Sequence, residues 1–245
     1  MTVTSVVTVP ATALLVPEVA TGAAHELADL REAALRAVGE LVADVDRILV
    51  VAGTNEVDAP QPVASNVVAS WSRIGLDFEI PLDGRLGDNT DESESDGRQI
   101  PIAVALGAWL LNACSDVTPR EYLAVPVDPA AAPHHEAVSA DRLGILVLAD
   151  GSCTRGPKAP GAQVDGAIEH DQALQEALAS VDTAWFLDPR RVDDAQRFKA
   201  QGLAAWALAA RVISRQGGAW SGQVLATADP YGVFYVVSTW RPQSG

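Results

Sequence analysis

The chain has 245 residues and 48% hydrophobic content, enough for one α/β domain with a well-buried core. Its 32 acidic residues against 17 Lys and Arg give a formal net charge of −15, which would repel nucleic-acid backbones and anionic lipid surfaces. No cluster of basic residues offsets this charge, so neither nucleic acid nor a membrane is an expected partner.

The N-terminal segment is apolar, but it has no basic residues ahead of its apolar run. Pro10 and Pro17 interrupt it before it reaches membrane-spanning length. We interpret it as a strand and a loop, not as a signal peptide or anchor. Two cysteines, Cys114 and Cys153, make no disulfide framework in a chain of this length. These observations favour a cytoplasmic protein.

The first 52 residues predict a β-loop-α-β unit. Val3 to Val9 is rich in Val and Thr, as strands are, and a loop with two prolines follows from Pro10 to Val19. Apolar residues recur at helical spacing from Ala23 to Ala43, and Arg47 to Ala52 is an apolar second strand. A crossover of this kind implies that the two strands pair in parallel.

The rest of the chain continues to alternate between strand and helix patterns. After the first unit we predict a loop at Gly53 to Pro62, a strand with a turn-prone start at Trp71 to Pro81, an acidic insertion at about residues 83–98, a buried helix at Ile100 to Ala113 and a short strand at Tyr122 to Val127. There follow a Pro/Ala loop at Asp128 to Ala137, a strand at Gly144 to Ala149, an amphipathic helix at Val164 to Val181, one or two helices in Val192 to Gln216, and a hairpin of Ser221 to Ala228 with Val233 to Trp240. The acidic insertion cannot bury enough apolar area to offset the entropy of ordering it, so we expect a mobile loop. The alternation predicts a single α/β domain over residues 1–245, with a central, mostly parallel or mixed sheet, helices on both faces and a C-terminal β-hairpin.

The most informative segment is the apolar run from Gly144 to Ala149, which ends abruptly in a loop rich in Gly, Pro and basic residues. Ligands of parallel sheets bind beyond the carboxyl ends of the strands. We therefore expect the polar residues of this loop to face a cleft: Asp150, Ser152, Arg155 and Lys158. Arg155 and Lys158 could hold an anionic ligand together with loop amides. The alternative is that they only balance an acidic surface.

Three short motifs follow one another along the chain. They are the Pro-x-x-x-Leu-Leu-Val-Pro-Glu run from Pro10 to Glu18, the Asp-Gly-Ser and Lys-Ala-Pro-Gly run from Asp150 to Gly161, and Pro-Tyr-Gly-Val at Pro230 to Val233 with Trp240 beyond it. Together they resemble the LigB-type superfamily, which contains the catalytic B subunits of class III extradiol ring-cleavage dioxygenases and the related Memo proteins. The resemblance spans nearly the whole chain. It implies an α/β fold and, in active members, a non-haem Fe(II) held by two His and a carboxylate at the strand ends.

The positions that the resemblance assigns to this iron site lack the usual groups. Ala11 stands where the first His ligand would be, Glu56 stands in place of the second, and the acid/base His falls near Arg155. A methyl group cannot bind a metal, a lone carboxylate binds it weakly, and a guanidinium cannot shuttle protons near neutral pH. The resemblance assigns no residue of this sequence to the final acidic ligand. We therefore predict no bound cofactor.

Other residues could rebuild a site. The chain has four histidines: His25, His134, His135 and His170. The adjacent pair lies in a Pro/Ala loop, where solvated histidines are commoner than ligands. Oxygen ligands that suit Mg or Ca could converge from three strand-end loops: Glu18, Asn55, Glu56, Asp150 and Ser152. The alternative is that Glu18 and Asp150 cap helices or bind backbone amides. A nucleophilic role for Ser152 or Cys153 is a weaker hypothesis, because the Gly-x-Ser-x-Gly elbow is absent.

The sequence thus leads to a hypothesis and a rival. The hypothesis is a cytoplasmic LigB-like protein that has lost the Fe(II) site and binds a small anionic or aromatic ligand, or a protein partner in a homo- or hetero-oligomer. The rival is an active extradiol dioxygenase for a catecholic substrate, with Fe(II) held by a rebuilt site. The candidate pocket residues are Ala11, Glu18, Asn55, Glu56, Asp150, Ser152, Arg155, Lys158 and Tyr231.

Overall fold

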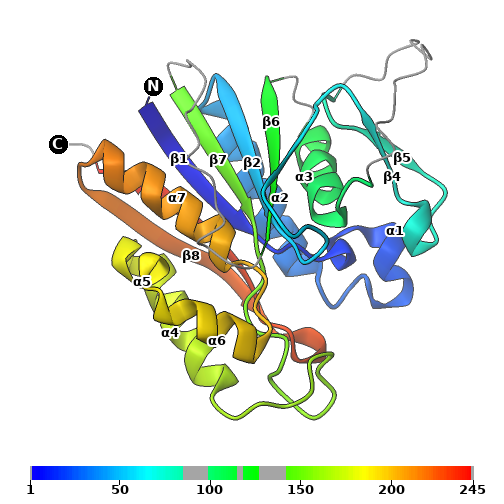
Figure 1. Cartoon of the computed structure of the whole chain (residues 1–245). Coiled ribbons are helices and arrows are strands. Elements are labelled where there is room, and N and C mark those ends of the chain that lie inside the picture. The colour runs from blue at the N-terminus through cyan, green and yellow to red at the C-terminus, as the bar shows by residue number, and fades with distance from the viewer. Residues whose placement is uncertain (1, 85–98, 115–117, 127–141, 244–245) are drawn as a thin grey trace.

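A computed structural model describes residues 2–84, 99–114, 118–126 and 142–243. Its centre is a seven-stranded sheet with the strand order β3-β6-β2-β7-β1-β9-β8 (Figure 1). Four parallel strands form the middle: β6 (Arg120–Val125), β2 (Arg47–Gly53), β7 (Arg142–Leu148) and β1 (Thr2–Val9). Antiparallel strands lie at the edges: β3 (Gln61–Val63) on one side, and β9 (Tyr235–Pro242) followed by β8 (Trp220–Ala228) on the other. The predicted α/β class, the mixed sheet and the C-terminal hairpin are confirmed.

Helices cover both faces of the sheet. One face packs against α2 (Ala28–Ala43) and α3 (Ile102–Ala113). The other packs against α4 (Ala167–Ser180), α5 (Thr183–Leu187) and α7 (Leu203–Gln216). Successive strand residues point to opposite faces, so Val6 joins the second core and Val7 the first. The central strands read as continuous apolar runs because both of their faces are buried.

A further short helix, α6 (Arg190–Phe198), packs against α5 and α7 on the second face (Figure 1). Sequence periodicity anticipated α6 and α7 within one segment but missed α5. The Asp182 side chain begins α5 by accepting a hydrogen bond from the Trp185 amide. None of the helices in the described ranges combines the length and apolarity needed to cross a membrane.

The predicted direct pairing of the first two strands is wrong. β1 and β2 are parallel, but each pairs with β7, which lies between them. β7 is the most apolar strand, and its residues from Leu143 to Leu148 are all buried. A strand of this kind is most stable in the centre of the sheet, where both faces and both edges are covered.

The N-terminal connection is more regular than the loop that was predicted for Pro10 to Val19. It contains a 3-10 turn (Ala13–Leu15) and the short helix α1 (Pro17–Ala20). Thr12 caps the turn through its hydroxyl, and Pro17 occupies the first helical position, which suits its fixed φ. The long helix then begins at Ala28 and not at Ala23. The residues before Ala28 that fitted the helical spacing lie in shorter turns and not in the long helix.

The strand predicted from Trp71 to Pro81 is found only over Glu79–Pro81, and its turn-prone start is a 3-10 turn. β3 begins inside the loop predicted to end at Pro62. β4 (Val68–Ser70) and β5 (Glu79–Pro81) form a separate two-stranded sheet, joined through a 3-10 turn (Ser72–Ile74). The Trp71 ring is buried and stacks on Phe78 with 5.2 Å between ring centroids. Gly75, at a φ of 83°, reverses the chain between these rings, a conformation that favours glycine.

Other predicted elements are found close to their expected bounds. The buried helix predicted to begin at Ile100 is α3, and the short strand predicted from Tyr122 is β6. Beyond Gly84, the acidic insertion lies outside the described residues, as does the Pro/Ala loop that carries His134 and His135.

Candidate functional site

The loops that follow β1, β2 and β7 meet at one edge of the sheet, because parallel strands end together. Asp150 follows β7, and its Oδ1 accepts a 2.9 Å hydrogen bond from the backbone N–H of Ala11, which follows β1. The structure therefore brings Ala11 and Asp150 together. The sequence left two alternatives for Asp150, a metal ligand or a group that caps a helix or binds a backbone amide. In the structure it binds a backbone amide, which belongs to the loop after β1.

Asp150 is half-buried, and the loss of water around its carboxyl group raises its pKa to about 7. The hydrogen bond from Ala11 favours the charged form and opposes part of this rise. Tyr235, at the start of β9, lies within range of the same charge. Burial first, and then the Asp150 charge, raise the pKa of the Tyr235 phenol to about 12. Burial thus brings the pKa of Asp150 close to neutral pH.

Ser152 and Arg155 form a buried polar network with α4. The Ser152 hydroxyl donates to Oδ2 of Asp171 at 2.5 Å, and the Ser152 amide donates to Oδ1 at 2.9 Å. Arg155 lies with Nε 3.4 Å from Oδ2 of Asp171 and a terminal nitrogen 3.2 Å from Asp229. Its guanidinium also covers the Phe234 ring at 5.0 Å. Arg155 is therefore paired with two carboxylates of this chain.

Burial raises the pKa of Asp171, while the Ser152 hydrogen bonds and the Arg155 charge act in the opposite direction. The acid is almost completely enclosed, and so is Ser152. A buried carboxylate with these partners ties the loop after β7 to α4 and to the segment that leads into β9.

Glu56 belongs to the scaffold on the other side of the edge. Its Oε1 accepts a 3.0 Å hydrogen bond from the amide of Ile102, the first residue of α3, and its Oε2 pairs with Arg73 at 2.7 Å. An acidic group at a helix N-terminus satisfies a free N–H and complements the helix dipole. One oxygen of Glu56 therefore caps α3, and the other holds Arg73.

These contacts bear on the iron site that the resemblance implied. Ala11 has no donor in its side chain, Glu56 has committed both oxygens, and Arg155 carries a positive charge into the place of the acid/base group. The residues at these positions do not fit Fe(II), which needs imidazole and carboxylate donors with open positions. Within the described ranges, no group of three or more His, Cys, Asp or Glu side chains is arranged to hold a metal ion.

The two described histidines have ordinary roles. His25 is exposed, and its Nδ1 lies 3.1 Å from the Gly22 carbonyl oxygen. His170 is buried against Phe198 and Trp185, with ring centroids 4.8 Å and 6.0 Å away. Burial lowers the pKa of His170, which favours the neutral ring.

The remaining candidates are dispersed. Glu18 is exposed in the first turn of α1, and Lys158 is exposed on the loop after β7. The Tyr231 hydroxyl donates to Oε2 of Glu26 at 2.8 Å, and the Tyr231 backbone has a φ of 60°. Glu18, Lys158 and Tyr231 therefore lie apart from Asp150. Asn55, in contrast, lines a pocket.

That pocket, of about 380 Å³, opens beside the carboxyl ends of β2 and β7. Its polar lining within the described ranges comes from Asn55, Cys153, Gln196, Lys199 and Gln201. The rest of this lining is small and apolar, as at Pro160 and Ala195. No acidic side chain belongs to the described part of the lining.

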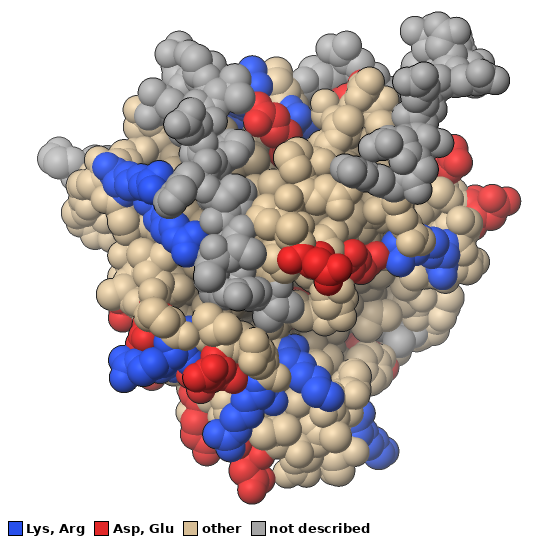
Figure 2. Space-filling view, in the orientation of Figure 1, with Lys and Arg blue, Asp and Glu red and all other residues tan. Residues whose placement is uncertain are grey.

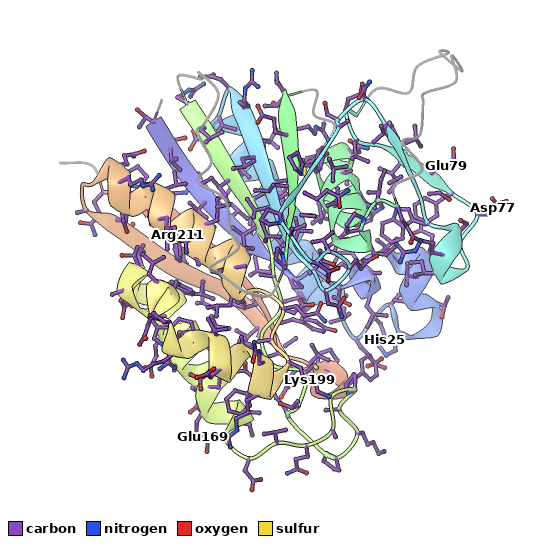
Figure 3. The ribbon with its side chains drawn as sticks, in the orientation of Figure 1. His25, Asp77, Glu79, Glu169, Lys199 and Arg211 are labelled. Atoms are coloured by element: carbon purple, nitrogen blue, oxygen red, sulfur yellow. The ribbon has the colours of Figure 1, made fainter. Side chains whose placement is uncertain are left out.

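Close backbone contacts build the pocket wall. A Cβ on Gly53 would lie 2.3 Å from the Gln201 carbonyl oxygen, so only glycine lets the end of β2 approach the link between α6 and α7. The Cys153 amide donates to the Phe198 carbonyl at 3.1 Å. Lys199 follows α6 at a φ of 53° and donates from Nζ to the Gly161 carbonyl at 3.0 Å. Figure 3 shows Lys199 where α6 meets the loop after β7.

The segment that follows Asp193 and Asp194 of α6 contributes most of the described pocket lining and lacks acidic residues. From Ala195 to Ala228 the sequence has no Asp or Glu, but it contains Arg197, Lys199, Arg211 and Arg215. Figure 2 shows Lys and Arg side chains along α7, and side chains of both charges over α6. Burial is the main cause of the raised pKa of the Cys153 thiol. The Lys199 charge lowers this pKa, and Asp150 raises it further.

Sequence reasoning missed Lys199, Gln196 and Gln201. The signal that could have found them is the stretch from Ala195 to Ala228, which contains no Asp or Glu although the chain as a whole is strongly acidic. Comparison with protein-family models and with curated proteins found no match to this chain. Function is therefore inferred from the geometry of the site.

Proposed function

We propose that this chain is a LigB-like α/β protein that has lost the Fe(II) site and binds a small ligand at the carboxyl edge of its sheet. The observation that carries the proposal is the pocket of about 380 Å³ lined by Asn55, Cys153 and Lys199. Its volume falls within the range of small-molecule sites, and its position is the one where α/β sheets bind ligands.

The contacts of the residues at the implied iron-site positions support the loss of iron binding. Glu56 caps α3, Arg155 neutralises Asp171 and Asp229, and the Ala11 amide binds Asp150. Each of these contacts stabilises the scaffold without a metal.

We also propose a cytoplasmic location and association with a second subunit. Cys114 and Cys153 form no disulfide in the described part of the chain, which suits a reducing compartment. Association is suggested only by the resemblance. Light scattering on the purified protein measures it, and a monomer at all concentrations would contradict it.

Metal analysis and a turnover assay test the central proposal. Protein purified without chelators should contain far less than one iron per chain. After anaerobic reconstitution with Fe(II), it should consume no oxygen with catechol. Ligand-observed NMR with small acids and their amides should instead detect binding. Stoichiometric iron with ring opening would overturn the proposal and establish the dioxygenase alternative.

A further inference from the structure

We propose that the pocket binds a small organic carboxylate, whose charged group contacts Lys199 and the side-chain amides of Asn55 and Gln201 and whose short apolar body lies against Pro160. This inference rests on the proposed function and adds the class of ligand. It transfers the anion-binding role from Arg155 and Lys158 to Lys199.

Charge is the first argument. Arg155 already pairs with Asp171 and Asp229, so its charge is neutralised within the protein. Lys158 is exposed and does not belong to the described lining of the pocket. Lys199 lines the pocket, and the hydrogen bond found for its ammonium group in the described residues is to a neutral carbonyl, that of Gly161. An ammonium group has three donors, so two remain for a ligand.

The neighbouring donors are the second argument. Asn55, Gln196 and Gln201 each bring an amide that can donate to a carboxylate oxygen without adding charge. Gln201 also lies next to the N-terminus of α7, a helix of 14 residues whose N-cap residue, Gly202, has no capping side chain. The positive end of the helix dipole adds to the Lys199 potential at this point.

Asp150, which lies outside the described lining of the pocket, opposes an anion there only weakly. Asp150 is close enough to Cys153 to raise the pKa of its thiol, and it faces Ala11 and Tyr235 on its other sides. Because burial raises the pKa of Asp150 to about 7, its negative charge is only partly present near neutral pH. An anion should therefore bind more tightly at pH 6 than at pH 8.

The apolar lining is the third argument. The described lining also contains Pro160, which is exposed, and Ala195 and Ala200, which are almost completely buried by the protein itself. A bare inorganic anion would leave the Pro160 ring in contact with water, whereas a short carbon chain would cover it. A carboxylate on a short apolar body therefore fits the lining better than a free phosphate does.

Hexanoate and hexanamide make a matched pair of probes, since they have the same shape and differ by one charge. Isothermal titration or ligand-observed NMR should give a dissociation constant of about 1 mM for hexanoate. Binding of hexanamide should be about tenfold weaker. Inorganic phosphate is the third probe and should bind more weakly than hexanoate.

The variant that tests the assignment is Lys199→Gln, which removes the charge but keeps a donor for the Gly161 carbonyl. It should weaken hexanoate binding about tenfold and leave hexanamide binding unchanged. Lys158→Gln is the matched control, because it removes the same charge from an exposed side chain outside the described lining. It should leave both affinities within about twofold of the wild-type values. Thermal unfolding of each variant verifies the fold.

Three outcomes would overturn the inference. One is hexanamide binding as tightly as hexanoate, which would leave the proposed small-ligand function in place. Another is that phosphate binds as tightly as hexanoate and is weakened equally by Lys199→Gln, which would make the pocket a general anion site. The third is equal effects of the two Lys variants. Failure of the proposed function would look different, because it would appear as stoichiometric iron and turnover of catechol.

Discussion

Ser152 and Cys153 are neighbours on the loop after β7, but their side chains point to two regions in which charged groups are arranged differently. The Ser152 side chain points to Asp171, where Arg155 completes a closed network in which each charge has a partner in the chain. The Cys153 side chain lines the pocket beside Lys199, whose charge meets only a neutral carbonyl in the described residues. We call these regions the closed side and the open side.

The difference follows from burial. A buried ion must be neutralised inside the protein, because the cost of removing it from water is large. An ammonium group that keeps contact with water has no such requirement, so its counter-charge can come from a ligand. The sequence favoured Arg155 as an anion-binding residue because it lies on the loop after a buried strand. In the structure the Arg155 side chain is itself largely buried, and this is why it pairs with carboxylates of the protein.

Replacing the shared acid of the closed side should have the strongest effect. Asp171→Ala leaves Ser152 without its acceptor and Arg155 with only Asp229, so the free energy of unfolding should fall by about 3 kcal/mol. Urea unfolding measures it. Asp165→Ala, at an exposed acid, is the control and should change little. The affinity of folded Asp171→Ala for hexanoate should stay within about twofold of wild type. A tenfold loss would show that the two sides are not separate.

Crowding the wall of the open side should have a smaller effect on stability and a larger one on binding. Gly53→Ala places a methyl group against the Gln201 carbonyl, which must move, at a cost of about 2 kcal/mol. Because Gln201 lines the pocket, hexanoate binding should also weaken severalfold. Gly156→Ala is the control, since a Cβ there meets nothing within 4 Å. Unchanged stability and binding in Gly53→Ala would contradict the close approach of β2.

The pH dependence of stability tests the carboxyl group that joins the loops after β1 and β7. Asp150 holds its proton up to a pH of about 7 in the folded state, against its ordinary value of 3.8. Its contribution to stability is therefore complete below pH 3.8 and is lost as the pH rises through 7. Asp150→Asn removes this dependence and keeps an acceptor for the Ala11 amide.

Between pH 4 and pH 7, the free energy of unfolding of the wild-type protein should fall by about 1.5 kcal/mol relative to that of Asp150→Asn. The expected fall is smaller than for a fully buried carboxyl group, because the Asp150 side chain keeps some contact with water. Thermal unfolding of both proteins across this range gives the difference. Parallel curves for the two proteins would show that Asp150 does not titrate in this range.

The mildest change is expected at the cap of α3. Glu56→Ala frees the Ile102 amide and breaks the pair with Arg73, so the free energy of unfolding should fall by about 1 kcal/mol. Asp58→Ala, an exposed acid on the same loop, is the control. Iron content should be the same in both variants and the wild type. Iron lost only in Glu56→Ala would assign Glu56 to a metal site instead.

The elements that sequence reasoning located well carry strong local signals. The apolar run of α3, the buried strand β7 and the hairpin around Asp229 to Gly232 depend on periodicity and turn residues. The errors have a tertiary cause. Trp71 to Pro81 has the composition of a strand, but the stacking of Trp71 on Phe78 requires the chain to turn back between them.

The candidate site shows the same division. Composition and the order of strands were enough to place Asp150 at the carboxyl edge, because that edge is where a buried parallel strand must end. Lys199 lies nearly fifty residues further along the chain, and it reaches the same edge only because α6 ends beside the loop after β7. The partners of Glu56 and Arg155 likewise come from distant segments. Local residue patterns are set by short-range sterics and hydrophobic spacing, whereas the pairing of charges depends on which distant segments pack together.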